Sequence, residues 1–248
     1  MIIGAGQQFP KNNSHCVIQL KFQNSSNYKV NTATNGSGLS ITDKVGGSPE
    51  ALSQGTHTGD LAGLGKYCIF PGGAMGIGRS FELADNSKIR IGYQPFTLCG
   101  WYQSIYNSSC SNICNFIHNK YHTVGCNGNF NYGINAVYSD RDFLAGTTCD
   151  ETTNIEYFPI FYNYSINKFS HFAVCRKSTG TNQVFSFSDG VLKGTSTISK
   201  YLKDNNEVIE LMSSNNYLYF FKGYMSNFTL IIGECLWDRA FTPPNRAS

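Results

Sequence analysis

Short runs of β-branched and aromatic residues recur along the chain and are separated by clusters of Gly, Asn and Ser. No long stretch places apolar residues at helical spacing between capping residues. This pattern predicts an all-β fold with many short strands, either a sandwich or a barrel. The expected strands are residues 16–22, 68–70, 88–91, 96–104, 113–118, 130–136, 155–161, 169–177, 183–188, 191–197, 208–212 and 220–233.

Apolar and polar residues alternate most clearly on the two sides of Asp189-Gly190, where residues 184–188 read VFSFS and residues 191–193 read VLK. An Asp-Gly pair between two such runs predicts a tight hairpin, because both turn positions need positive φ. Alternation also predicts which side chains share one face of a sheet. The residues expected in the core between two facing sheets are Phe96, Leu98, Trp101, Phe172, Val174, Phe185 and Phe187.

The pattern favours a single domain. Residues 24–65 are rich in Gly, Ser, Thr and Asn and hold few large apolar residues, so we expect loops there with one short strand. Neither an internal repeat nor a linker separates two cores, and all-β folds of this length are often one domain. We therefore predict one β-sandwich domain over residues 14–248, preceded by an N-terminal arm, residues 1–13, to which the sequence assigns no role.

Composition narrows the class of protein. Hydrophobic residues make up 41% of the chain and aromatic residues 14%, which excludes a disordered chain, while only 14% are charged. The net charge is +3 without a block of Lys or Arg, so we expect no nucleic-acid partner. Apolar runs such as 228–233 are far too short to span a membrane. The first residues lack the basic and long apolar regions of a secretory signal, so we expect none.

Nine cysteines are present. Cys99 and Cys175 lie in apolar strand-like runs, where cysteine usually acts as a small buried hydrophobic residue. Cys110, Cys114 and Cys126 form a loose cluster without the matched second pair that is typical of a zinc site. We therefore expect reduced, structural thiols.

Four stretches, taken in order, resemble the concanavalin A-like lectin and glucanase superfamily in its laminin-G-like form. They are residues 17–22 (VIQLKF) with 65–73 (GKYCIFPGG), 89–102 (IRIGYQPFTLCGWY), 169–176 (FSHFAVCR) with 187–190 (FSDG), and 220–228 (FFKGYMSNF) with 236–244 (LWDRAFTPP). Phe169 stands where the family more often has Trp. The resemblance implies a jelly-roll of two facing antiparallel sheets, and the FTPP ending is similar to modules of bacteriophage and other virion proteins. A fold alone implies little about the ligand.

The sequence gives no sign of catalysis. Glycosidases of this superfamily carry an E-x-D-x-x-E strand that supplies their paired carboxylates, and this chain has no such run. The nearest acidic residues, Asp150, Glu151 and Glu156, lie in a loop-like segment at the wrong spacing. His171 lies in a strand where the resemblance implies a structural histidine. We expect no catalytic residue and a protein that is not an enzyme.

Two segments combine aromatic residues with asparagine, which is typical of glycan sites and of protein interfaces. The candidate ligand-binding residues are Tyr121, His122, Asn127, Asn129, Asn131, Tyr132, Tyr138, Tyr162 and Tyr164. For Asp140-Arg141-Asp142 we favour a turn stabilised by its side chains, and the alternative is a calcium ion held by Asp140 and Asp142. We expect no other cofactor.

These observations favour a virion structural or adhesion protein, such as a capsid decoration, head-fibre or tail-associated component. The absent secretory signal, the polar uncharged surface and the FTPP ending all favour it. Such a protein would lie on the virion surface as an oligomer or part of a larger assembly, in contact with other virion proteins or with a cell-surface glycan. The alternative is a free-standing lectin that binds glycans, and a glycoside hydrolase is a distant third.

Overall fold

A computed structural model describes residues 14–21, 30–45, 57–61, 65–74, 79–84, 86–104, 113–119, 132–137, 143–149, 155–162, 169–177, 183–197, 209–211, 213–214 and 219–244. Its elements are β1 (Cys16–Leu20), β2 (Ile41–Val45), β3 (His57–Leu61), β4 (Gly65–Ala74), β5 (Arg79–Leu83), the 3₁₀ helix η1 (Ser87–Ile89), β6 (Phe96–Ser104), β7 (Ile113–Asn119), β8 (Tyr132–Val137), β9 (Phe143–Cys149), β10 (Ile155–Tyr162), β11 (Ser170–Arg176), β12 (Gln183–Ser188), β13 (Val191–Thr197), β14 (Ile209–Leu211), β15 (Ser213–Ser214) and β16 (Tyr219–Ile232).

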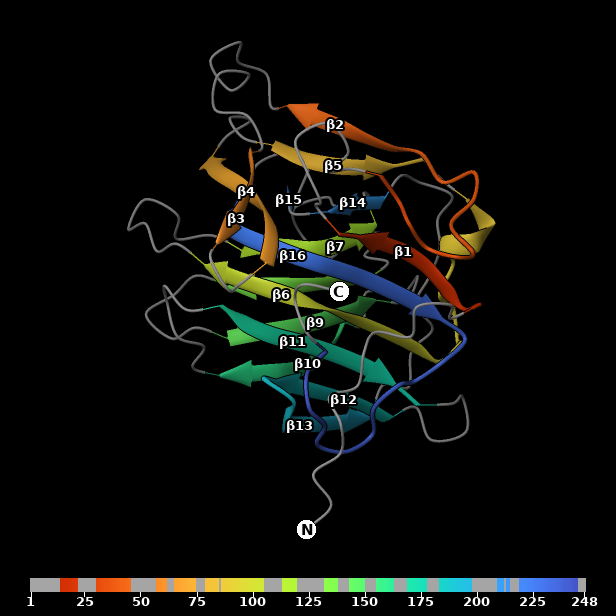
Figure 1. The fold of residues 1–248 in the computed structure, drawn as a ribbon. Helices are drawn as coiled ribbons and strands as arrows, with labels where there is room; N and C mark the ends of the chain where they lie inside the picture. Colours follow the sequence, from red (N-terminus) through yellow and green to blue (C-terminus); the bar gives the residue numbers. More distant parts are fainter. Residues whose placement is uncertain are drawn as a thin grey trace.

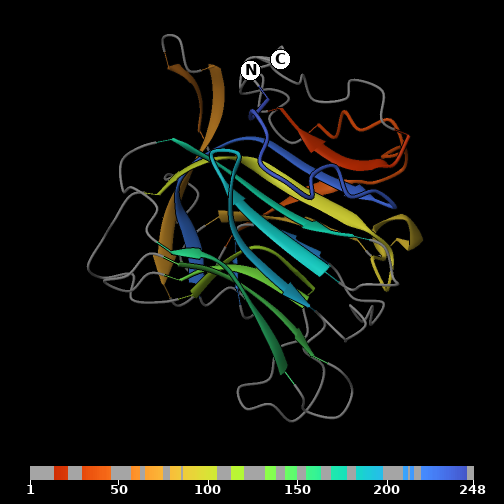
Figure 2. The ribbon, with the colours of Figure 1, turned by 90° about the horizontal axis from the view of Figure 1, so that it is seen from below.

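The strands form two antiparallel sheets that face each other (Figures 1 and 2). Sheet A has nine strands in the order β13-β12-β11-β6-β16-β4-β3, with β1 and β15 also paired to β16. Sheet B has seven strands in the order β10-β9-β8-β7-β14-β5-β2. Neighbouring strands are often distant in the sequence, as in a jelly-roll, so the predicted all-β sandwich is confirmed.

The main core lies between the two sheets. Sheet A contributes alternate side chains such as Phe96, Leu98 and Tyr102 of β6, and sheet B contributes Phe81 and Leu83 of β5. The other buried members of this cluster are Val17, Ile18, Leu20, Ile41, Ile89, Ile91, Phe172, Val174, Val184, Ile209, Leu211, Met225, Phe228, Leu230 and Ile232. These apolar side chains, removed from water, supply the main driving force for closing the sandwich.

The predicted hairpin is present between β12 and β13. Asp189 has a φ of 50° and Gly190 a φ of 77°, the two positive values that a tight Asp-Gly turn requires. Ser188 pairs with Val191 and Phe187 with Leu192, the register that a two-residue loop sets, before a bulge between Ser186 and Phe187 shifts the pairing by one residue. This local signal was therefore sufficient to place one edge of sheet A.

Some predicted elements were wrong. The alternating residues 88–91 were expected to form a strand, but Lys88 and Ile89 lie in η1 and the next two residues lie in no strand. The Asn86 side chain caps the turn and accepts a hydrogen bond of 3.0 Å from the Lys88 amide. Residues 24–65 hold two strands, β2 and β3, instead of one. Strands β5 and β9 had not been predicted either.

The core prediction was also wrong for three aromatic residues. Phe185 and Phe187 belong to a second cluster, on the face of sheet A that points away from sheet B, while Val184 points into the main core. Trp101 lies on this outer face too, because its ring meets that of His171 rather than the inter-sheet cluster. Sheet A is thus covered on both faces at β11, where every residue is buried, whereas its edge strand β13 is largely exposed.

Candidate functional site

The outer face of sheet A is covered by residues 233–244, which we call the C-terminal strap. The strap leaves β16 and crosses in front of β11 and β12 (Figure 1), on the side opposite sheet B (Figure 2). At its start the Gly233 amide donates to the Pro95 carbonyl at 2.7 Å. The Thr97 hydroxyl then donates to the Glu234 carbonyl at 3.1 Å and accepts from the Leu236 amide at 2.9 Å. One buried hydroxyl therefore fixes the backbone on both sides of residue 235.

The far end of the strap is fixed by two further hydrogen bonds. The Phe241 amide donates to the Gly190 carbonyl at 3.0 Å, and the Trp101 indole donates to the Pro244 carbonyl at 3.1 Å. A Cβ at Gly190 would overlap the Phe241 carbonyl oxygen. The glycine of the hairpin is thus needed twice, once for its positive φ and once for the close approach of the strap.

Between these anchors the strap inserts aromatic side chains into the second apolar cluster. Trp237 and Phe241 are stacked, with ring centroids 3.9 Å apart and planes only 5° from parallel. Phe241 also meets Phe187 edge-on at 5.2 Å. The cluster consists of Cys99, Ala173, Cys175, Phe185, Phe187 and Trp237, with Cys235, Leu236 and Phe241 at its margin. The strap is therefore a packed part of the fold.

His171 lies in the middle of this aromatic cluster and is completely buried. Its ring meets those of Trp101, Phe241 and Trp237 edge-on, at centroid distances of 5.3, 5.7 and 6.0 Å. Neither ring nitrogen has a hydrogen-bond partner among the described residues. Burial lowers the pKa of this imidazole from 6.5 to about 3, so the ring is neutral and cannot exchange protons readily with solvent. The structure thus gives His171 a packing role, as the resemblance implied.

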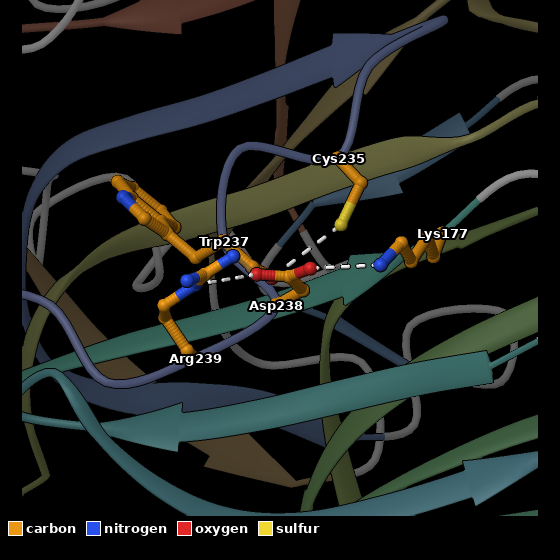
Figure 3. Close-up of polar contacts among 5 residues, drawn as sticks. All are labelled: Lys177, Cys235, Trp237, Asp238 and Arg239. Atoms are coloured by element: carbon orange, nitrogen blue, oxygen red, sulfur yellow. Dashed lines mark hydrogen bonds and ion pairs between the residues drawn. The ribbon is translucent and has the colours of Figure 1, made fainter.

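The outward side of the strap carries a small charged group (Figure 3). The Asp238 carboxylate lies 2.8 Å from the Lys177 ammonium and 3.1 Å from Nε of Arg239. Hydrogen bonds from these two cations lower the pKa of Asp238, so the carboxylate is ionised and unsuited to act as a general acid.

Two cysteines meet where the strap crosses β11. Cys175 is buried in the strand, and Cys235 in the strap is partly exposed. Their side chains are hydrogen-bonded to each other. The Cys235 sulfur also approaches the Trp237 carbonyl oxygen at 3.4 Å (Figure 3). Burial raises the pKa of Cys175, while the hydrogen bond from Cys175 lowers the pKa of Cys235. The prediction of free thiols is confirmed for Cys16, Cys99, Cys175 and Cys235.

The predicted ligand-binding residues fall mostly outside the described part of the chain. This holds for Tyr121, His122, Asn127, Asn129, Asn131, Tyr138 and Tyr164, and for the proposed calcium ligands Asp140 and Asp142. The two that remain, Tyr132 and Tyr162, both lie in sheet B. Tyr132 pairs with Thr148, whereas Tyr162 pairs with Phe143, which pairs in turn with Val137. The register therefore places Tyr132 and Tyr162 at opposite ends of the β8–β10 ladder, so the two do not share one site.

The described residues provide neither a cluster of metal ligands nor a membrane-spanning helix. Within these segments no three His, Cys, Asp or Glu side chains are grouped so that they could hold a metal ion. In the same part of the chain, none of the helices has the length and apolar character needed to cross a membrane.

Comparison with solved structures reveals the same fold in proteins of dissimilar sequence. Domain 4 of AbnA, an extracellular arabinanase from Geobacillus stearothermophilus solved in complex with arabinotriose, aligns with a TM-score of 0.59 and 15% identity, over 89% of this chain and 93% of that domain. The binding domain of botulinum neurotoxin DC, solved in complex with SialylT, aligns with a TM-score of 0.59 and 13% identity. Botulinum neurotoxin type C, whose cell entry depends on interaction with two ganglioside molecules, aligns with a TM-score of 0.59 and 12% identity.

This chain spans about half of each of the two neurotoxin chains, 50% and 49% respectively. No protein-family profile matches the chain, and no curated protein is significantly similar to it in sequence. At these identities the likeness shows the fold alone. The chain has the concanavalin A-like jelly-roll fold, and the fold prediction is thereby confirmed.

Sequence reasoning missed the residues that the strap brings together. Cys235 and Asp238 were not predicted as site residues, because their partners Cys175 and Lys177 are distant in the sequence. The one available signal was the stretch LWDRAFTPP, in which large aromatic residues follow the last strand instead of the polar residues expected of a free tail. That signal indicates a docked segment without saying onto which face it docks.

Proposed function

We propose that this chain is a non-catalytic carbohydrate-binding module. The observation that carries the proposal is the agreement in fold with domain 4 of AbnA over 89% of this chain and 93% of that domain, which was solved with arabinotriose bound. The cell entry of botulinum neurotoxin type C depends on interaction with two ganglioside molecules, and the binding domain of botulinum neurotoxin DC was solved in complex with SialylT. Few charges and many aromatic and asparagine residues in this sequence suit a neutral glycan.

We assign the glycan site to the end of sheet B where Val137, Phe143 and Tyr162 are paired across three strands. Adjacent strands are about 4.8 Å apart, so this pairing brings the ends of β8 and β10 to within about 10 Å of each other. Tyr138 follows Val137 directly in the sequence, and Tyr164 comes two positions after Tyr162. Two predicted tyrosines are thus close in sequence to this end of the sheet, where Tyr162 lies, and this proximity along the chain supports a shared site.

The remaining candidates, from Tyr121 to Tyr132, occupy a single connection between β7 and β8 and the start of β8. Tyr132, at the start of β8, lies at the opposite end of the β8–β10 ladder from the proposed glycan site. Tyr132 is therefore a matched control, since it is a tyrosine of the same sheet at the other end.

The test is glycan-array binding followed by titration calorimetry of the best ligand, starting with arabinotriose and sialylated oligosaccharides. We expect saturable binding that Tyr162→Ala and Tyr138→Ala weaken by about tenfold or more, because truncating an aromatic contact in a binding site commonly costs that much. Tyr132→Ala should bind like the unaltered protein. Absence of binding to every glycan would refute the function, and a loss with Tyr132→Ala alone would refute the placement of the site.

The remaining sequence-based expectations are tested alongside. Incubating the best ligand with the protein and assaying for new reducing ends tests the proposal that the module is not an enzyme, with no release expected. Repeating the titration with calcium and with a chelator tests the alternative reading of Asp140 and Asp142. The virion interpretation stays a prediction from the sequence, since the similar structures described above come from an extracellular enzyme and from toxins.

A further inference from the structure

The two thiols at the strap crossing are held in fixed positions relative to each other. Cys175 is anchored in β11, between its partners Thr97 on β6 and Phe185 on β12. Cys235 is anchored because the Thr97 hydroxyl bonds the residue on each side of it. Both anchors share Thr97, so the contact between the two sulfur atoms follows from the sheet register and does not depend on a loose loop.

The two thiols differ in environment. Cys175 is fully buried, and Cys235 is partly exposed beside the Asp238–Lys177 ion pair, whose two charges act on the pKa of Cys235 in opposite directions. The hydrogen bond from Cys175 lowers the pKa of Cys235, and burial raises the pKa of Cys175. Reactivity toward disulfides requires an accessible thiolate, so Cys235 is suited to react first and Cys175 is suited to react second.

We propose that Cys235 and Cys175 form a thiol–disulfide exchange site, in which Cys235 attacks a small-molecule disulfide and Cys175 resolves the product into an internal disulfide. The neighbouring Lys177 and Arg239 side chains both pair with Asp238, so charges of both signs lie beside Cys235. The product would bond the C-terminal strap covalently to β11. This inference is independent of the proposed glycan function.

The reaction balances without another reagent. The Cys235 thiolate attacks one sulfur of the small disulfide, the S–S bond breaks, and one small thiolate leaves. Cys175 then gives up its proton, its sulfur attacks the Cys235 sulfur, and the second small thiolate leaves. The protein loses two protons and two electrons in total, and the small disulfide is reduced to two thiols.

The experiment uses the full chain, reduced and desalted, then incubated with oxidised glutathione and alkylated. Peptide mapping by mass spectrometry under non-reducing conditions should find the peptide of Cys175 linked to the peptide of Cys235. In Cys175→Ser the reaction should stop at glutathione attached to Cys235, because the resolving thiol is missing. In Cys235→Ser the peptide of Cys175 should carry neither glutathione nor a link, because its thiol is buried.

Cys99→Ser is the matched control, since Cys99 is another buried thiol of the same apolar cluster. It should form the 175–235 link as the unaltered protein does. Circular dichroism and thermal melting show whether each variant is folded, and Cys175→Ala replaces Cys175→Ser if the buried hydroxyl prevents folding. The proposal is overturned if folded protein keeps both thiols alkylated after oxidation, or if Cys175 carries glutathione in Cys235→Ser.

Discussion

Acidification should destabilise this protein through His171 before most of its carboxylates are protonated. The imidazole is buried among three aromatic rings, and its pKa falls from 6.5 to about 3. Between these two values the unfolded chain binds a proton that the folded chain does not bind. The contribution of His171 to the free energy of unfolding is therefore fully present above pH 6.5. It declines as the pH falls from 6.5 toward 3 and does not change further below pH 3.

The magnitude follows from the pKa difference. Each pH unit below 6.5 costs about 1.4 kcal/mol, so the contribution of His171 to the loss at pH 5 is about 2 kcal/mol. A loss of this size is a large share of the free energy of unfolding of a typical domain, which is about 5–15 kcal/mol. Replacing His171 with Leu, an apolar residue of similar size that cannot be protonated, should remove this part of the pH dependence whatever it does to stability at neutral pH.

Urea unfolding at pH 7.5 and pH 5.0 measures the effect. Both tryptophans of the chain, Trp101 and Trp237, contact the His171 ring, so their fluorescence reports on this region. Between the two pH values the unaltered protein should lose about 2 kcal/mol more than His171→Leu loses. A second variant, His171→Gln, should show the same reduced pH dependence, although its absolute stability will differ. Equal losses in the unaltered protein and in both variants would refute the reasoning.

Three further changes test the strap by urea unfolding at neutral pH. Gly190→Ala should lower the free energy of unfolding more than Gly38→Ala does. Both glycines have positive φ, which costs alanine about 1–3 kcal/mol of strain, but only at Gly190 does the strap leave no room for a Cβ. Equal losses in the two variants would contradict the close approach of the strap. Trp237→Ala should cost about 3–5 kcal/mol, because it empties the centre of the outer apolar cluster, and a loss below about 1 kcal/mol would mean that the strap is not packed. Oxidation of Cys175 and Cys235 closes a loop of about 60 residues and should stabilise the protein by about 4 kcal/mol, an increase that a reductant reverses.

Local patterns were sufficient for much of the fold. Strands β6, β11 and β12 were predicted because their residues are apolar, β-branched or aromatic, and the Asp189-Gly190 turn was predicted because few residues accept positive φ. Strand β9 was missed, because its sequence FLAGTTC holds small residues that also suit a loop. The segment 88–91 was misassigned, because a single capping side chain, that of Asn86, outweighed its alternation.

The candidate site was less predictable for a different reason. Alternation identifies two faces of a strand but does not say which one meets the other sheet, and here sheet A is covered on both faces at β11 and β12. Phe185 and Phe187 were therefore assigned to the wrong cluster. The contacts of Cys235 and Asp238 depend on how the C-terminal strap crosses sheet A, and no spacing within the sequence encodes that crossing. Tyr132 and Tyr162 were grouped by composition, and only the strand register separates them.

Strand β16 has a consequence for how the chain folds. It is hydrogen-bonded to β1, β4, β6 and β15, so it joins residues near the start of the described chain to residues near its end. Long loops must close before these contacts form. The chain therefore loses conformational entropy early in folding and gains the energy of the strand contacts only later. We expect refolding over milliseconds to seconds, on the order of other all-β sandwiches of high contact order. Until β16 is in place, β4 and β6 lack the strand that joins them.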